Sequence, residues 1–481
     1  MSITNSLNSA LSGLAANARR ADVASSNIAN ALTDGYGRRV LDVSSRTAGY
    51  HGSGVRIDGV RRLSDPVILA DRRNADGAAA AADRRSDALA TVEAAIGGPG
   101  APDGIAARLA AVESALIAAT GDPASDTRLK QTYRAMTDLT GSLDRASTVV
   151  QAERVRADAD IAVSIETLNR SFGQVRDLNS DVQRALATGR DPSALIDQRQ
   201  VVIDRISQIV PVREIPQADG RIALWSTGGM QLVDGRAVQL GFQPRATITP
   251  DMTRSSGALS GLSVDGAPLT NGGVGRLTGG SLEALFDLRD DALVQRQQDL
   301  DEIAQDLMIR FSDPAVDPTL APGSGGLFID TNPIPPASDP TGLSQRLTVD
   351  PRLDPQGAAE TWRLRTGMDA AGPGEAGDPS QLLRFSDAFM APLAISASGP
   401  MLTTFDRVAK ASESASLDRL AAEESAVFSA ARRDSLRSAE LANGVDTDAE
   451  LQTLLLVEQA YAANARVVET IDQMIRRLME I

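Results

Sequence analysis

The residues that could carry chemistry in this chain are few, and none of them completes a site. Asp446, Asp448 and Glu450 alternate like the first ligands of a calcium-binding loop. Such a loop also needs glycine at its sixth position and glutamate at its twelfth, and this stretch has neither. We therefore interpret these carboxylates as a helix N-terminus, where Thr447 and Glu450 form a capping box before an apolar run.

The other candidate residues lack partners for catalysis. His51, the only histidine, stands in a glycine-rich stretch from Gly49 to Gly54 and is interpreted as a polar turn residue. The run Gly272-Gly273-Val274-Gly275 lacks the Lys-Ser/Thr of a phosphate loop and predicts a turn. Without cysteine, a thiol nucleophile or thiolate metal site is excluded. We expect no enzyme, no catalytic residue, no metal, no cofactor and no small-molecule substrate.

Composition points to a helical protein with a thin core. The chain has 481 residues, enough for about three domains, and is 42% hydrophobic but only 3% aromatic. Its net charge of −15 argues against nucleic acid and anionic membranes as partners. No run approaches the ~18 apolar residues of a membrane span. The first residues lack a basic leader and apolar core, so no cleaved signal peptide is expected.

Both ends of the sequence carry apolar residues at alternating spacings of four and three, the repeat of coiled coils. The first set is Leu7, Leu11, Leu14, Ala18, Ala21, Ser25, Ile28 and Leu32; the second is Leu454, Val457, Tyr461, Asn464, Val468, Ile471, Ile475 and Leu478. Small residues weaken the first set, and Asn464 lowers the stability of the second while fixing its register. We predict a polymerisation interface formed by Leu7, Leu11, Leu14, Ile28, Leu32 and the whole second set.

Proline divides the remaining chain into helical flanks and an irregular middle. Of 23 prolines, 18 lie between Pro211 and Pro400. The apolar pattern predicts a strand near 55–60 and helices that end near residues 96, 121, 186 and 210. The heptad from Ile161 to Leu186 is interpreted as an intramolecular core face. Gly444 separates two helices in the last flank.

The middle region shows strand and turn patterns. Two Asp-Gly pairs, Asp234-Gly235 and Asp265-Gly266, stand between alternating apolar residues and predict hairpins. A helix is predicted over 281–311. Residues 313–380 predict at most short strands, at 346–349 and 361–364.

The predicted fold is mainly α with a β-rich middle. It has paired terminal coiled-coil helices, a helical bundle domain and an outer β domain. The predicted division is 1–60 (first half of the inner coiled coil and a turn), 61–210 (helical domain), 211–280 (β-rich outer domain), 281–311 (returning helix), 312–400 (variable outer segment), 401–443 (helical domain) and 444–481 (second half of the coiled coil).

The residues after the first heptad resemble a known signature. Residues 25–36 read Ser-Ser-Asn-Ile-Ala-Asn-Ala-Leu-Thr-Asp-Gly-Tyr. They are similar to the bacterial flagellar axial proteins (rod, hook and hook-associated), in which Asn-Ile-Ala-Asn leads to Thr-x-Gly-Tyr. Ser26, Leu32 and Asp34 depart from the usual Asn, Asn and Pro. The predicted motif turn consists of Asn27, Asn30, Thr33, Gly35 and Tyr36.

The resemblance covers nearly the whole chain and is weakest over 312–400. Residues 444–450 and 459–465 resemble the C-terminal segment of this family. The hook-associated branch of the family is favoured by three stretches: 59–62, 195–199, and 228–233 together with 279–289.

The resemblance implies a structural adaptor at the hook–filament junction. It would be an extracellular protein, exported unfolded through the flagellar channel without a cleaved signal peptide. The implied partners are the hook protein, the other junction protein (hook-associated protein 3), copies of this chain in a ring, and an export chaperone that binds the C-terminal helix.

Two alternatives stay open at this stage. A hook or rod subunit would turn to β structure soon after the Gly-Tyr pair, whereas residues 67–210 predict helices. Without the motif, the terminal heptads would also suit a cytoplasmic coiled-coil scaffold.

Overall fold

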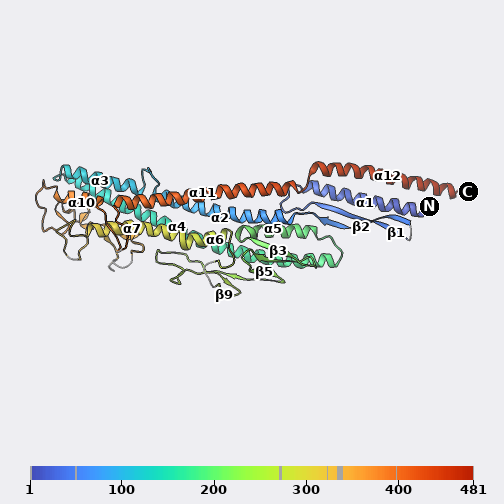
Figure 1. Cartoon of the computed structure of the whole chain (residues 1–481), viewed down its shortest axis with the longest axis horizontal. Helices are drawn as coiled ribbons and strands as arrows, with labels where there is room; N and C mark the ends of the chain where they lie inside the picture. The colour runs from blue at the N-terminus through green and yellow to red at the C-terminus, as the bar shows by residue number, and fades with distance from the viewer. Residues whose placement is uncertain are drawn as a thin grey trace.

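The computed structural model of the chain describes residues 3–48, 51–269, 274–321, 323–332, 340–396 and 398–479. It is a long rod with both termini at the same end (Figure 1). The rod is mainly helical, and small antiparallel sheets come from the middle of the sequence. The predicted fold class is therefore confirmed. None of the helices in the described ranges is long and apolar enough to cross a membrane.

The terminal end of the rod contains two helices and a hairpin. Helix α1 (Ile3–Ala29) packs along α12 (Thr447–Met479), and the hairpin of β1 (Arg39–Ala48) and β2 (His51–Arg62) packs against α1 (Figure 1). The predicted strand near 55–60 lies in β2, whereas β1 was not predicted. His51 opens β2, and the preceding residues 49 and 50 of the predicted turn lie outside the described residues.

Long helices form the body of the rod. They are α2 (Pro66–Ile96), α3 (Ile105–Gly121), α4 (Asp126–Ala187), α5 (Ser193–Ile209) and α11 (Thr404–Ala442). Their ends agree closely with the predicted ones, because Gly and Pro stop each helix. Helix α4 has 62 residues, a length of about 93 Å. A capping box of Thr403 and Asp406 begins α11.

The heptad of α4 lies in the core, as predicted. Its buried members are Ile161, Ile165, Leu168, Phe172, Val175, Asn179 and Val182. Leu186 is the exception, at 47% exposed; it lies near the end of α4, against the turn at Gly220. The heptad therefore faces the interior of the rod until its last residue.

Two small sheets lie along one flank of the helices (Figure 1). One contains β3 (Val212–Pro216), β4 (Ile222–Ser226), β5 (Gln231–Asp234) and β6 (Arg236–Ala237); the other contains β7 (Leu240–Gly241), β8 (Ser263–Val264) and β9 (Ala267–Pro268). Both predicted Asp-Gly hairpins are confirmed. Asp265 and Gly266 have φ values of 49° and 84°, the left-handed pair that a type I′ turn requires.

The predicted helix over 281–311 contains a π turn. Helix α6 (Ser281–Asp287) leads through η1 (Leu288–Ala292) into α7 (Leu293–Phe311). The π turn directs Arg289 inward, where its Nη1 lies 2.6 Å from Asp158 Oδ1 and neither side chain is exposed. Arg154 donates to the carbonyl of Arg289, and burial lowers the pKa of Arg154 to about 10.

Residues between α7 and α11 pack at the end of the rod farthest from the termini (Figure 1). The elements there are β10 (Phe328–Asp330), α8 (Leu343–Arg346), β11 (Leu347–Val349), η2 (Pro351–Leu353), α9 (Arg363–Thr366) and α10 (Ser380–Met390). The rings of Phe328, Phe385 and Phe389 surround Phe311 at centroid distances of 5.4, 5.9 and 4.8 Å. The strand predicted at 361–364 is wrong. Thr361 is anchored to Asp126, and Trp362 leads into the single turn of α9.

Candidate assembly interface

Helix α12 turns one apolar face toward α1. Val457 and Ile471 are 6% and 3% exposed. The other half-buried members of this face are Leu454, Asn464, Val468 and Ile475. These six residues belong to the predicted heptad; Leu478 also lies in α12, but its side chain is outside the described part.

Tyr461 does not lie in this face. It is 48% exposed, and the half-buried Ala460 lies beside the contact instead. The helices approach closely here, because a Cβ on Gly13 of α1 would lie 3.1 Å from Asn464 Nδ2. Asn464 donates to the carbonyl of Ala460 in its own helix and lies against Gly13. Its role in fixing the register stays a prediction.

Helix α1 buries mainly small residues. They are Ala10, Ala16, Asn17, Ala24 and Asn27, while Leu7, Leu14 and Ile28 are half-buried. Leu11, at 49% exposed, and the exposed Ala18 and Ser25 do not share this buried face, so the heptad does not describe how α1 packs within the chain. As a contact for another subunit, Leu11 stays a prediction. The buried face is shifted because α1 contacts the hairpin as well as α12: Val55 N donates to Ser12 Oγ at 3.1 Å.

Leu32 is the other departure from the first heptad. Helix α1 ends at Ala29, because Asn30 Nδ2 donates to the carbonyl of Ser26 at 2.9 Å and folds the chain back. Leu32 therefore lies in the following turn and is 93% exposed. As a residue of α1 it was placed wrongly; as a contact for another subunit it stays a prediction.

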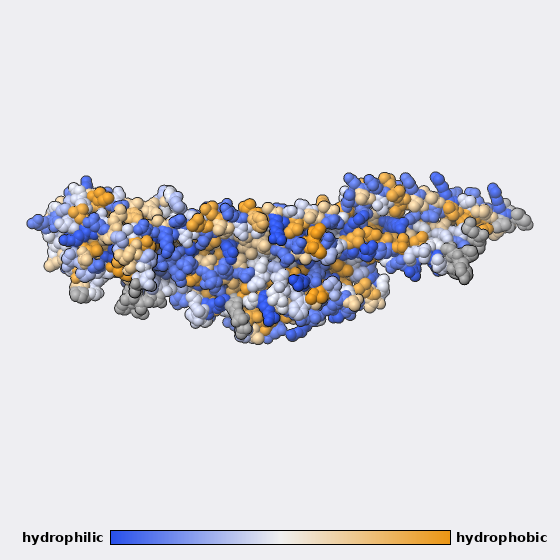
Figure 2. Space-filling model, viewed as in Figure 1, coloured by the Kyte–Doolittle hydropathy of each residue, from blue (hydrophilic) through white to orange (hydrophobic). Residues whose placement is uncertain are grey.

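A second apolar stripe on α12 was missed by the sequence reading. Leu456, Ala463, Val467 and Met474 are all exposed and follow one another at spacings of seven, four and seven. We call these four residues the free stripe of α12. Figure 2 shows apolar side chains on the surface over α12. A helix with two apolar stripes can contact two neighbours, and the predicted heptad accounts for only one of them.

The motif turn is closed by Asn27. This fully buried side chain donates to the carbonyl of Arg39 at 2.9 Å, and its Oδ1 accepts from Arg39 N and Tyr36 Oη at 3.0 and 2.8 Å. Thr33 Oγ1 donates to Asn30 Oδ1 at 3.3 Å. The five predicted turn residues therefore lie together, and they direct the chain from α1 into β1.

Asp197 of α5 connects this turn to the rod. Its carboxylate accepts from Gly37 N at 3.1 Å, and from Arg39 Nη2 and Arg62 Nε at 2.8 Å each. Arg62 also donates to the carbonyl of Gly35. We call Asp197, Arg39, Arg62, Gly35 and Gly37 the joint. Local spacing does not predict this role for Asp197, because its partners lie 135 to 160 residues away in the chain.

Gly35 allows the close approach at the joint. Its φ is +76°, and a Cβ there would lie 2.5 Å from Val201 Cγ2 of α5. Gly35→Ala is expected to lower the free energy of unfolding by about 2–3 kcal/mol, because backbone strain and the clash add. Gly189→Ala is the control: φ is +68° but nothing lies within 4 Å, so about 1 kcal/mol is expected. Urea unfolding of both variants measures the difference; equal losses would contradict the contact with α5.

The predicted capping box at the start of α12 is wrong. Asp446 Oδ1 accepts from the backbone N–H groups of Asp448 and Ala449, so Asp446 caps the helix. The Glu450 carboxylate instead pairs with Arg38 at 2.8 Å, and Glu450 is only 3% exposed. Glu450, the glutamate predicted to complete the capping box, therefore attaches α12 to the turn that follows α1.

A second ionic cluster connects α2, α5 and α11 in the body of the rod. Arg72 lies 2.7 Å from Asp76, 2.7 Å from Asp204 and 2.6 Å from Glu440. Burial raises the pKa of Asp76 and of Glu440, and the Arg72 charge opposes this rise. The C-terminal end of α11 is thereby fixed to α2 just before the chain enters α12.

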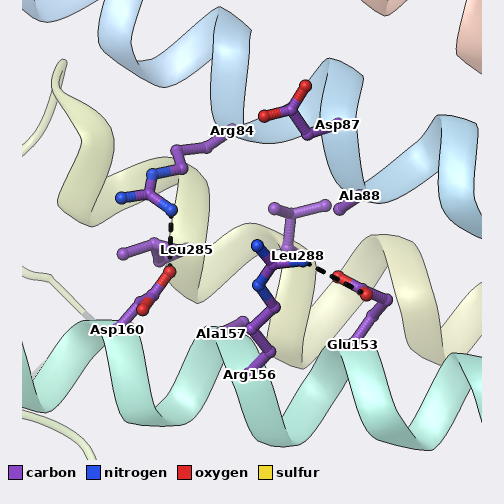
Figure 3. Close-up of a pocket in the computed structure, with 9 residues that line it drawn as sticks. All are labelled: Arg84, Asp87, Ala88, Glu153, Arg156, Ala157, Asp160, Leu285 and Leu288. Atoms are coloured by element: carbon purple, nitrogen blue, oxygen red, sulfur yellow. Dashed lines mark hydrogen bonds and ion pairs between the residues drawn. The ribbon is translucent and has the colours of Figure 1, made fainter.

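The surface hollow beside Arg84 does not suggest a ligand site. It lies between α2, α4 and the α6–η1 segment and holds about 30 Å³, room for one or two water molecules. Figure 3 shows that Arg84 bridges to Asp160 across it, at 2.8 Å. Among the described residues, no group of three or more His, Asp or Glu could hold a metal ion.

Comparisons with known proteins match the ends and the middle of the chain separately. Residues 7–36 match the family described as flagella basal body rod protein, and 441–481 match the flagellar basal body rod FlgEFG protein C-terminal family. Residues 89–314 match the helical domain of the flagellar hook-associated protein FlgK. Three separate parts of the chain are therefore similar to flagellar rod, hook and hook-associated proteins.

Within that class, the chain is similar to proteins named flagellar hook-associated protein 1. The Escherichia coli (strain K12) protein of that name is 24% identical over 62% of this chain and 54% of its own length. The Bacillus subtilis (strain 168) protein is 23% identical over 49% of each. The solved FlgK structure from Burkholderia pseudomallei has a TM-score of 0.46 at 20% identity, covering 54% of this chain and 46% of that one. The chain spans about half the length of the curated relatives it matches.

Proposed function

We propose that this chain is a structural, non-enzymatic adaptor at the hook–filament junction of the bacterial flagellum, and that it assembles through its terminal helices. The match of residues 89–314 to the FlgK helical domain supports a junction protein over a hook or rod subunit. The observation that carries the mechanism is the free stripe of α12, which stays exposed after the other face of α12 has packed against α1.

The proposal includes where the protein acts and what it meets. It is exported and extracellular, and its partners are the hook protein, hook-associated protein 3 and further copies of itself in a ring. An export chaperone covers α12 before assembly. An exposed apolar helix face of this kind needs cover inside the cell, because uncovered apolar stripes promote aggregation.

Assembly works by burying the free stripe between subunits. The stripe is exposed in the monomer, so its burial is available only when a neighbour arrives. Burial of apolar surface contributes roughly 25 cal/mol per Å² removed from water. Many weakly favourable contacts, each repeated around a ring, then hold the subunits together.

Val467→Asp tests this proposal. Val467 is 45% exposed and lies outside the buried and half-buried residues of α12 that face α1, so the monomer should keep most of its stability while a charge enters the subunit contact. We expect at least a tenfold loss of swimming and of incorporation into sheared flagella, since a misplaced charge costs several kcal/mol.

The control is Gln473→Asp, which adds the same charge at an exposed position outside the free stripe. It should swim normally. Normal swimming of the Val467→Asp strain, with the protein present in its flagella, would overturn the proposed mechanism.

A further inference from the structure

Helix α11 carries an apolar ridge that no described part of the chain covers. Leu417, Leu420, Val427 and Phe428 are 57%, 45%, 66% and 69% exposed. Their spacings of three, seven and one place them on one side of the helix, away from the face that packs on α2. We call these four residues the α11 ridge.

Phe428 is the most unusual member of the ridge. The chain has nine phenylalanines, and the other eight are buried or half-buried. Phenylalanine is costly to expose and is enriched in the centres of protein contacts. Its position near the middle of α11, with Val427 beside it and Leu420 about two turns away, is typical of such a centre.

We propose that the α11 ridge is a contact surface for a second copy of this chain, lying alongside the first in the assembled flagellum. The inference rests on the proposed function and extends the subunit contact from α12 onto the body of the rod. Helices α11 and α12 follow each other along one edge of the molecule (Figure 1), and apolar side chains appear along that edge in Figure 2.

The shape of this surface selects its partner. The ridge spans about 17 Å of α11 and the free stripe about 27 Å of α12 at 1.5 Å per residue, and the two helices follow one edge of the molecule, so the two stretches form a long, narrow surface. A compact partner would cover only part of so long and narrow a surface. A second rod of the same length covers all of it. Copies in a ring are related by rotation, so the ridge meets a different face of its neighbour.

The local charges permit this contact between two acidic chains. The protein has a net charge of −15, so two copies repel unless their contact is balanced. Along the ridge, Glu423 and Glu424 lie one turn before Val427 and Phe428, and Arg432 lies one turn after Phe428. The positive charge of Arg432 beside the apolar centre offsets part of the negative charge there and can pair with an acid of the second copy.

The test is photo-crosslinking in cells that assemble flagella. Benzoylphenylalanine replaces Phe428 in the full chain, and intact flagella are irradiated and examined by mass spectrometry. We expect a product of twice 50.4 kDa in which both peptides come from this chain. The same probe at Glu166, a 72% exposed residue of α4, should give no such product. A crosslink from position 428 to a different protein overturns the inference.

A probe at Val467 separates the two proposals. Crosslinks from 467 to a neighbouring subunit but none from 428 would overturn the ridge contact and leave the proposed function standing. No crosslink from either position in assembled flagella would overturn both.

A substitution gives a second readout. Phe428→Asp should leave thermal unfolding of the monomer unchanged, because the ring is exposed, and lower incorporation about tenfold. Phe428→Leu should retain most incorporation. Equal incorporation of the Asp and Leu variants would overturn the proposal.

Discussion

Ile471→Asp is expected to abolish incorporation into the flagellum while leaving the rod folded. Ile471 is 3% exposed in the contact between α12 and α1. Aspartate there would either be buried without a partner or force the two helices apart, at a cost of at least about 3 kcal/mol. The core of the rod is built from α2, α4, α7 and α11 and does not depend on this contact. Swimming and immunoblots of sheared flagella measure incorporation, and circular dichroism measures the remaining helix.

The conservative variant is Ile471→Val. It removes one methylene group and is expected to cost about 1 kcal/mol, so cells should still swim. If Ile471→Asp cells swim as well as Ile471→Val cells, pairing of the terminal helices is not required for assembly.

Asp197→Ala is expected to lower the free energy of unfolding by about 3 kcal/mol and to free the hairpin from the rod. The carboxylate is 14% exposed and is paired with Arg39 and Arg62, so its removal leaves two largely buried guanidinium groups without their partner. Urea unfolding measures the loss of stability. Hydrogen exchange over residues 39–62 should rise, whereas exchange in α4 should not.

Asp42→Ala is the matched control in the same hairpin. The Asp42–Arg61 pair is exposed, at 42% and 59%, so its loss should cost no more than about 1 kcal/mol. Equal effects of the two substitutions would show that Asp197 does not hold the joint.

Local patterns in the sequence predicted most of the helices and both Asp-Gly hairpins. Such patterns depend on the period of apolar residues and on Gly and Pro, which act within a few residues. They also predicted six of the residues by which α12 packs on α1. Such patterns do not show that one helix packs against two neighbours. For that reason they predicted neither the exposure of Leu11 in α1 nor the free stripe of α12.

The joint could not be predicted from spacing. Asp197 meets Gly37, and Glu450 meets Arg38 across 412 residues of chain. A glutamate near the start of a helix is typical of a capping box. Only the ion pair with Arg38 shows that Glu450 has a different role. The motif turn was found through its resemblance to the flagellar proteins, and the structure adds why Asn27 and Gly35 are needed there. The division of the chain into domains, and the role of the listed stripes in polymerisation, stay predictions.

Because α4 is long, a small rotation at the joint displaces the far end of the rod by a large distance. The rod body extends for about 93 Å along this helix, and the terminal helices lie at only one end of it. A tilt of about 5° at Asp197 would swing the far end through roughly 8 Å, more than the width of one side-chain contact. The stiffness of the ion pairs of Asp197 with Arg39 and Arg62 therefore limits how far the opposite end of the rod can move relative to the terminal helices.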